Sequence, residues 1–128
     1  MKFKFTKEKT DLKEMARVGK FEDFEILVWT NDSGNIPHFH VVDSNTKGDL
    51  FHTCVKITCA EYFHHTGKED TFNSGDKKDL VAFLSKMSSS PRFSKFTNWE
   101  VLLTLWNMNN SKIEVDENQP MPNYLALK

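Results

Sequence analysis

The chain has 128 residues, 27% of them charged, and a formal net charge of −1 at pH 7. This near balance excludes a general electrostatic attraction to nucleic acids or anionic membranes, and no apolar run approaches the ~20 residues of a membrane-spanning helix. The length suits one domain with an ordinary core, which the 11 phenylalanines and three tryptophans predict to be rich in aromatic side chains.

The N-terminus and the cysteines bear on the cellular compartment. The first residues alternate lysine and phenylalanine and lack the uninterrupted apolar stretch of a signal peptide. Cys54 and Cys59 flank the end of a predicted strand, and their separation does not suit a structural disulfide. We therefore expect a reduced, cytoplasmic protein.

Residues 1–20 are expected to form an N-terminal extension. Residues 2–6 alternate Lys and Phe, which is typical of a short, half-exposed strand. Residues 7–18 are charged and carry a few apolar residues at helical spacing, so they predict a short surface helix. Gly19 would end that helix.

Four later segments are rich in β-branched and aromatic residues or alternate between apolar and polar ones, and these predict strands. Turn-forming residues precede and follow the second of them, so two hairpins are expected to meet there. The four segments are residues 24–30, 36–43, 50–58 and 61–66.

The hydrophobic pattern limits how residues 36–43 pair with residues 50–58. Phe39 and Val41 should share a buried face with the apolar residues of the later strand, Phe51, Val55 and Ile57. An antiparallel pair achieves this only when facing residue numbers add to an even total. One such register sets His40 opposite His52 and His38 opposite Cys54.

Two amphipathic helices and an irregular tail follow the strands. Leu80, Phe83, Leu84 and Met87 fall at i, i+3, i+4 and i+7 and predict a helix over residues 76–88. Thr97 and Glu100 match a capping box that opens a second helix, which Asn107, Asn109 and Asn110 would end. Ile113 and Val115 could form a last short strand, and residues 117–128 are expected to be irregular.

This order predicts an α+β fold, with an antiparallel sheet of three to five strands and two amphipathic helices packed on one face. We interpret residues 1–128 as a single domain whose core unit is residues 24–110.

Part of this pattern resembles a known family. The run Val28-Trp29-Thr30-Asn31-Asp32 is followed by Pro37-His38-Phe39-His40-Val41, and an amphipathic helix and a second helix opening with Asn98-Trp99-Glu100 come later. In this respect the chain is similar to an uncharacterised family of small bacterial and phage proteins, a domain of unknown function found in toxin–antitoxin-like or mobile-element settings. The resemblance implies a small cytosolic accessory protein and no proven catalytic residues. The chain departs from the family in its N-terminal segment, its insert at 67–75 and its tail.

The histidines offer a sharper hypothesis. On the predicted strands, His38, His40 and His52 would share one face, with Cys54 at its edge, and cross-strand neighbours are close enough to hold one ion. Imidazole and thiolate ligands favour zinc or a similar transition metal. A site with an open position could activate water, whereas a site closed by all four ligands would be structural.

The sequence nevertheless favours histidines that only form hydrogen bonds to neighbouring residues, so we expect no cofactor. Metal binding is the alternative. A further alternative is that the same histidines act as acid/base groups without a metal. Asp43 and Glu61 are the candidates for orienting the imidazoles, and Ile26 and Val28 are expected to border the same face.

Five basic residues around the first helix could contact phosphates, although a solvated face is the favoured interpretation because acids lie among them. They are Lys77, Lys78, Lys86, Arg92 and Lys95.

Taken together, the sequence favours a small cytoplasmic accessory or regulatory protein, of phage or mobile-element type, that binds a protein partner. The alternatives are a metal-dependent hydrolase centred on the histidines and a nucleic-acid-binding module. No association with a membrane is expected.

Overall fold

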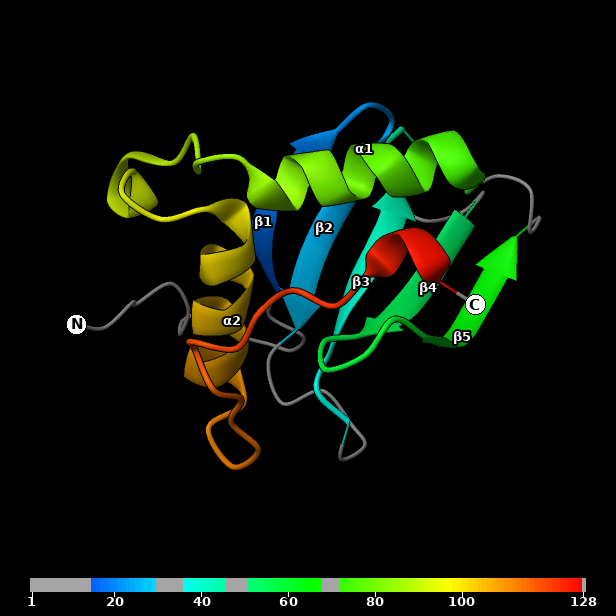
Figure 1. Cartoon of the computed structure of the whole chain (residues 1–128). Helices are drawn as coiled ribbons and strands as arrows, with labels where there is room; N and C mark the ends of the chain where they lie inside the picture. The colour runs from blue at the N-terminus through cyan, green and yellow to red at the C-terminus, as the bar shows by residue number, and fades with distance from the viewer. Residues whose placement is uncertain (1–14, 30–35, 46–50, 68–71, 128) are drawn as a thin grey trace.

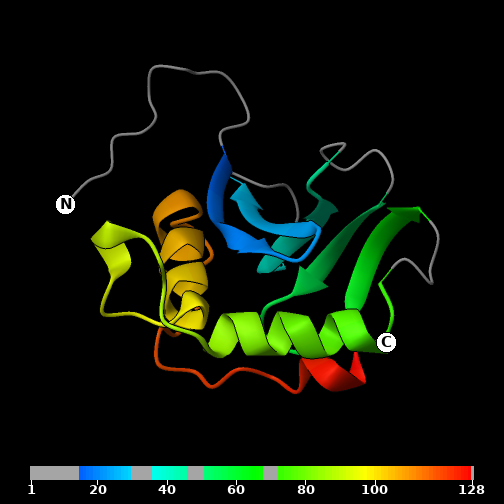
Figure 2. The same cartoon turned by 90° about the horizontal axis from the view of Figure 1, so that it is seen from above.

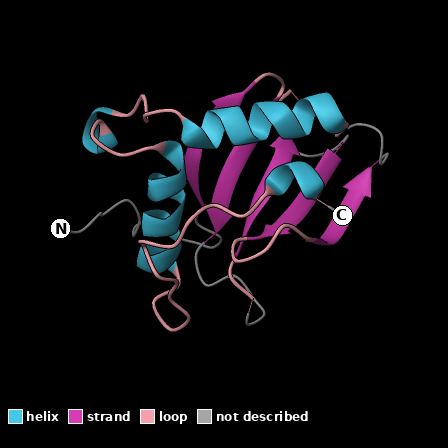
Figure 3. Cartoon of the chain, viewed as in Figure 1, coloured by secondary structure: helices cyan, strands magenta, loops and turns pink. Residues whose placement is uncertain are grey.

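The computed structural model describes residues 15–29, 36–45, 51–67 and 72–127, and these include a five-stranded sheet (Figures 1 and 3). All neighbouring strands are antiparallel, and their order in the sheet is their order in the chain. The four strands predicted after residue 20 are therefore confirmed, and a fifth precedes them. The strands are β1 (Met15–Phe21), β2 (Phe24–Trp29), β3 (His38–Asp43), β4 (Phe51–Lys56) and β5 (Tyr62–Gly67).

The first strand corrects the predicted helix over residues 7–18, which is wrong for residues 15–18. These residues belong to β1, and residues 15–17 pair with β2, so sheet pairing and burial of Val18 override a weak helical spacing. Gly19 is not a helix stop but lies inside β1, next to a shift in the β1–β2 register. Residues 1–14, including the strand expected at 2–6, lie outside the described residues.

The two helices begin with the same kind of cap. Helix α1 (Ser74–Ser85) starts two residues before the predicted 76–88 because Asn73 and Asp76 form a capping box, with both bonds at 3.0 Å. Helix α2 (Asn98–Asn109) has the predicted capping box of Thr97 and Glu100. It ends at Asn109, and Asn110 is its C-cap, within the asparagine cluster that was expected to stop it.

Both helices cover the same face of the sheet, which confirms the predicted α+β class (Figure 2). Helix α1 crosses the strands, and α2 lies against β1 and β2 (Figure 1). Between the layers lies an apolar core with almost no exposed surface on Phe39, Val41, Leu84 or Trp106. None of the helices in the described part of the chain has the length and apolar character to span a membrane.

The C-terminal segment packs back across the molecule instead of forming a strand at residues 113–115, and that prediction is wrong. The side chain of Asn107 bonds both backbone groups of Val115, so it takes the place of a neighbouring strand. Further on, the 3₁₀ helix η3 (Tyr124–Ala126) interrupts the otherwise irregular tail. Tyr124 is fully buried there and donates its hydroxyl to the carbonyl oxygens of Lys56 and Ile57 at 3.0 Å.

Candidate metal centre

Strand β3 positions the candidate ligands because both of its faces are buried. Phe39 and Val41 face the core shared with the helices, so the alternation of a strand turns His38 and His40 to the opposite face. At the end of the sheet, where β3 begins, the ring of His38 also reaches Trp106 of α2, with ring centroids 5.5 Å apart.

The pairing of β3 with β4 brings Cys54 to the histidines. The facing residue numbers add to an even total, as predicted, so Cys54 and His52 share the face of His38 and His40. The specific register was wrong by two residues, since His40 faces Cys54 and His52 faces Val42. A slip of two residues keeps every side chain on its face, so the hydrophobic pattern cannot detect it.

Three of the four candidate ligands form one compact group. One ligand atom each from His38, His40 and Cys54 lies within 4.8 Å of the other two. The three residues are 3%, 4% and 6% exposed, respectively, so the group is withdrawn from solvent. The sulfur Sγ of Cys54 is 3.5 Å from Nδ1 of His40.

The backbone contact of His38 determines the tautomer of its neutral ring. Its Nδ1 lies 2.7 Å from the carbonyl oxygen of Ile36. A carbonyl oxygen can only accept, so Nδ1 must donate, and in the neutral ring the lone pair is then on Nε2. Histidines that bind metals in proteins are held in this way by a backbone or carboxylate acceptor. The ring packs edge-on against Phe63 of β5 as well, at 4.8 Å between centroids.

His52 lies beside this group and is joined to it through His40. Its Nε2 is 2.8 Å from Nδ1 of His40, a hydrogen-bond distance. The side chain is half-buried, unlike those of the other three. The structure therefore brings the predicted set together as three ligand atoms plus one neighbouring imidazole.

Trp29 is a contributor that the sequence interpretation missed. Its indole stacks on the ring of His40, with centroids 4.4 Å apart and planes inclined by 14°, and it also borders His52 at 6.0 Å. Ile26 and Val28 were expected to line this face, but they lie in the core. The sequence did contain a signal for Trp29. Side chains alternate along β2, so odd-numbered Trp29 lies on the opposite face from even-numbered Ile26 and Val28.

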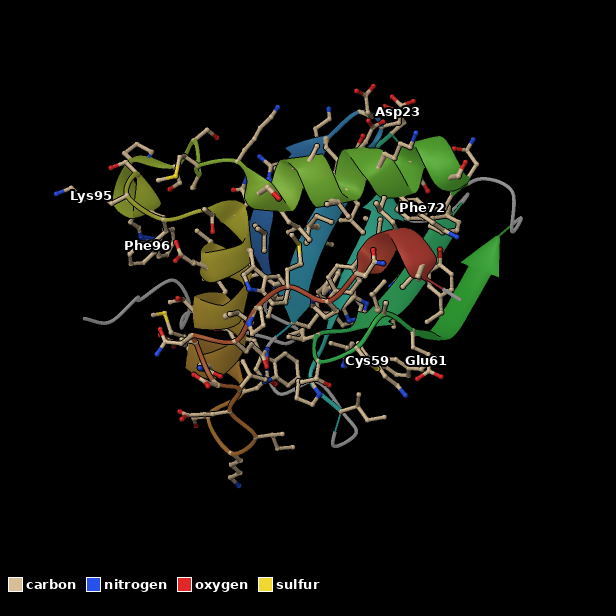
Figure 4. The ribbon with its side chains drawn as sticks, viewed as in Figure 1. Asp23, Cys59, Glu61, Phe72, Lys95 and Phe96 are labelled. Carbon is tan, nitrogen blue, oxygen red and sulfur yellow. The ribbon has the colours of Figure 1, made fainter. Side chains whose placement is uncertain are left out.

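The expected orienting acids are engaged at the strand ends. Asp43 accepts a hydrogen bond from the amide of Phe51 at 3.0 Å and so ties β3 to β4. Glu61 pairs with Lys56 at 2.6 Å and raises the pKa of that amine, and Cys59 is exposed beside it (Figure 4). Neither acid belongs to the compact group; His38 takes its orientation from a backbone carbonyl instead.

The geometry is close to what a tetrahedral metal requires. Zinc–nitrogen bonds of about 2.0–2.1 Å and a zinc–sulfur bond of about 2.3 Å place tetrahedral N and S ligands about 3.5 Å apart. The distance from Sγ of Cys54 to Nδ1 of His40 is 3.5 Å. The three buried residues could therefore hold a metal ion after small side-chain movements.

The five candidate phosphate contacts do not form one site. Lys77 and Lys78 lie in the first turns of α1, whereas Lys86 follows its end, about 13 Å further along the helix axis. Nζ of Lys77 donates to the carbonyl oxygen of Leu127 at 3.2 Å, which ties it to the tail. Arg92 and Lys95 lie with Lys86 in the segment between the helices.

Comparisons with models of protein families, with curated proteins and with solved structures found no match. The interpretation of the site therefore rests on its geometry and chemistry alone.

Proposed function

We propose that this chain is a small accessory or regulatory protein that takes up a zinc ion within its fold, through His38, His40 and Cys54. The observation that carries the proposal is the compact group itself, in which three buried ligand atoms lie within 4.8 Å of one another. Two imidazoles and one thiolate form a ligand set that suits zinc better than magnesium or calcium, which prefer oxygen.

The surroundings of the ligands support this role. The carbonyl of Ile36 holds the ring of His38 through Nδ1, so Nε2 is the nitrogen that carries the lone pair in the neutral ring. Trp29 covers the ring of His40 and restricts its rotation. Nε2 of His52 lies beside Nδ1 of His40, the same atom that lies 3.5 Å from Cys54, so His52 is the nearest additional imidazole to complete the coordination.

Burial of the ligands favours a structural or regulatory ion over a hydrolytic one. A catalytic zinc keeps one position open for water and substrate. Here none of the three ligand residues is more than 6% exposed, which leaves little surface through which a substrate could approach. The metal-dependent hydrolase is therefore the second candidate, and binding of a partner, the role implied by the family resemblance, is the first.

The experiment measures metal in the protein purified without an affinity tag. We expect about one zinc ion per chain by elemental analysis, and a cobalt-substituted sample with the intense visible bands of tetrahedral Co²⁺ and a thiolate charge-transfer band. Cys54→Ser should abolish the thiolate band and most of the metal. Cys59→Ser is the matched control, because it removes the other cysteine, which is exposed and lies outside the group.

The same experiment can reject the proposal. Wild-type protein that refolds with its native spectrum but retains no zinc or cobalt would show that the cluster is a hydrogen-bonded network without metal. Equal loss of metal from Cys54→Ser and Cys59→Ser would place the ion elsewhere. Retention of metal by His38→Gln would also exclude the proposed ligand set.

A further inference from the structure

The segment that connects α1 to α2 carries an exposed group of basic and aromatic side chains. We call residues 86–97 the connecting loop. It contains three cations, and the chain has no acidic residue between Asp79 and Glu100. Met87 is 55% exposed and Phe96 is 40% exposed, so large apolar surface accompanies the charge. Figure 4 shows Lys95 and Phe96 at the edge of the molecule, away from the sheet.

Hydrogen bonds fix the shape of the connecting loop. Its two ends pair with each other, since Met87 and Thr97 form an isolated antiparallel bridge. The amide of Ser88 donates to the carbonyl oxygen of Phe96, at 2.8 Å, and Phe96 in turn donates to Phe93, at 2.9 Å. The exposed side chains are therefore presented by an ordered backbone, which lowers the entropy lost when a ligand binds.

The aromatic rings form a short stack with a cation at one end. Phe93 is partly buried against the core and stacks on Phe96, with centroids 5.9 Å apart and planes inclined by 29°. The guanidinium carbon of Arg92 lies 5.4 Å from the centroid of Phe93. Phe93 thus anchors the stack, while Phe96 is open to solvent.

The cations of this loop are exposed to solvent. Among the described residues, no carboxylate forms an ion pair with Lys86 or Lys95. Both side chains are exposed, as is Arg92. Exposed aromatic surface flanked by exposed cations suits single-stranded nucleic acid, because bases stack on rings and phosphates pair with cations.

We infer that the connecting loop binds single-stranded nucleic acid, with a base stacked on Phe96 and phosphates contacted by Lys86, Arg92 and Lys95. The serines between these residues make the loop polar, so it lacks the continuous apolar face of a segment that inserts into a lipid surface. This inference is independent of the zinc site, and Cys54→Ser should bind the same oligonucleotides with unchanged affinity.

The test measures fluorescence anisotropy with labelled oligo-dT, oligo-U and a duplex of equal length. Phe96→Ala should weaken binding to single strands at least about fivefold, the loss expected for one stacked base. Phe96→Trp should restore it. Lys95→Gln should lower the slope of log affinity against log salt by about 0.7, as for one lost phosphate contact to a single strand.

Two substitutions elsewhere serve as controls. Lys112→Gln removes one exposed cation outside the loop, and Leu125→Ala removes a side chain that is 50% exposed on η3. Both should bind like the wild type. Three outcomes would overturn the inference. They are tighter binding to the duplex than to single strands, equal losses of affinity in the controls and the loop variants, and an affinity that Phe96→Ala leaves unchanged. Binding to vesicles of anionic lipid with no binding to either oligonucleotide would overturn it as well.

Discussion

The two tyrosine residues show how the fold accommodates a polar hydroxyl group on a buried or partly buried side chain. Tyr124 has no exposed surface, and its hydroxyl reaches two backbone carbonyl oxygens at the end of β4. Burial raises the pKa of Tyr124 well above its ordinary value, because the charged phenolate is poorly solvated in the interior and could no longer donate a hydrogen bond to those carbonyls. Burial also raises the pKa of Tyr62, from 10.0 to about 12.

These shifts predict that the protein loses stability in alkali. Between pH 10.0 and about 12 the folded chain holds phenol protons that the unfolded chain releases, so the free energy of unfolding falls as pH rises through this range. We expect phenolate absorbance to rise only as the fold is lost. In denaturant, both tyrosines should titrate with a pKa of about 10. Tyr62→Phe isolates the signal of Tyr124. A phenol that ionises near pH 10 while the aromatic circular dichroism stays native would contradict the burial of that side chain.

Gly19 of β1 shows how closely α1 approaches the sheet. A Cβ atom at this position would lie 2.4 Å from Cζ of Phe83, which is far closer than carbon atoms pack. The Phe83 ring also stacks on Phe21, with centroids 5.6 Å apart. The position requires glycine because a Cβ atom has no room there. The backbone angles themselves would suit any residue.

Gly19→Ala should therefore destabilise the protein by about 1–3 kcal/mol through overpacking, as measured by chemical denaturation. The loss should be smaller when Phe83 is replaced by Leu, because the smaller side chain leaves room for the new methyl group. A double-mutant cycle over these two positions gives the coupling directly. Additive effects would show that the ring already moves aside at no cost.

The same elements show how far the sequence could lead. Alternation determined which face of β3 and β4 each side chain occupies, so His38, His40, His52 and Cys54 were correctly assigned to one face. Alternation has a period of two, so it could not distinguish the observed register from one shifted by two residues. Distances between ligand atoms depend on that shift and on rotamers, and only the structure separates His52 from the compact group.

Other errors have the same origin in tertiary contacts. The first part of β1, residues 15–18, was assigned to a helix because its residues have mixed spacing, and pairing with β2 determines its conformation. The expected strand at 113–115 has the right composition, but Asn107 satisfies its backbone groups from a helix. A side chain that replaces a strand leaves no periodic signal in the sequence.

Helix α2 connects the two proposed sites. Its first turn follows the connecting loop, where the side chain of Asn98 donates to the carbonyl oxygen of Phe83 at the end of α1. Near its other end, Trp106 packs against His38 and donates to the carbonyl oxygen of Ile113 at 2.7 Å. One helix thus contacts both the end of the loop and a candidate ligand.

Zinc should therefore stabilise the entire fold. The ligands come from two strands, and the unfolded chain does not hold them together, so binding free energy adds to folding free energy. At a free zinc concentration 100 times the dissociation constant the gain is about 2.7 kcal/mol, which for a domain of this size raises the melting temperature by on the order of 10 °C. We expect this increase in calorimetry of the wild type and of Cys59→Ser, and its reversal by a chelator. Cys54→Ser should melt at a temperature that neither zinc nor chelator changes, and an equal increase in that variant would show that zinc stabilises the chain through other residues.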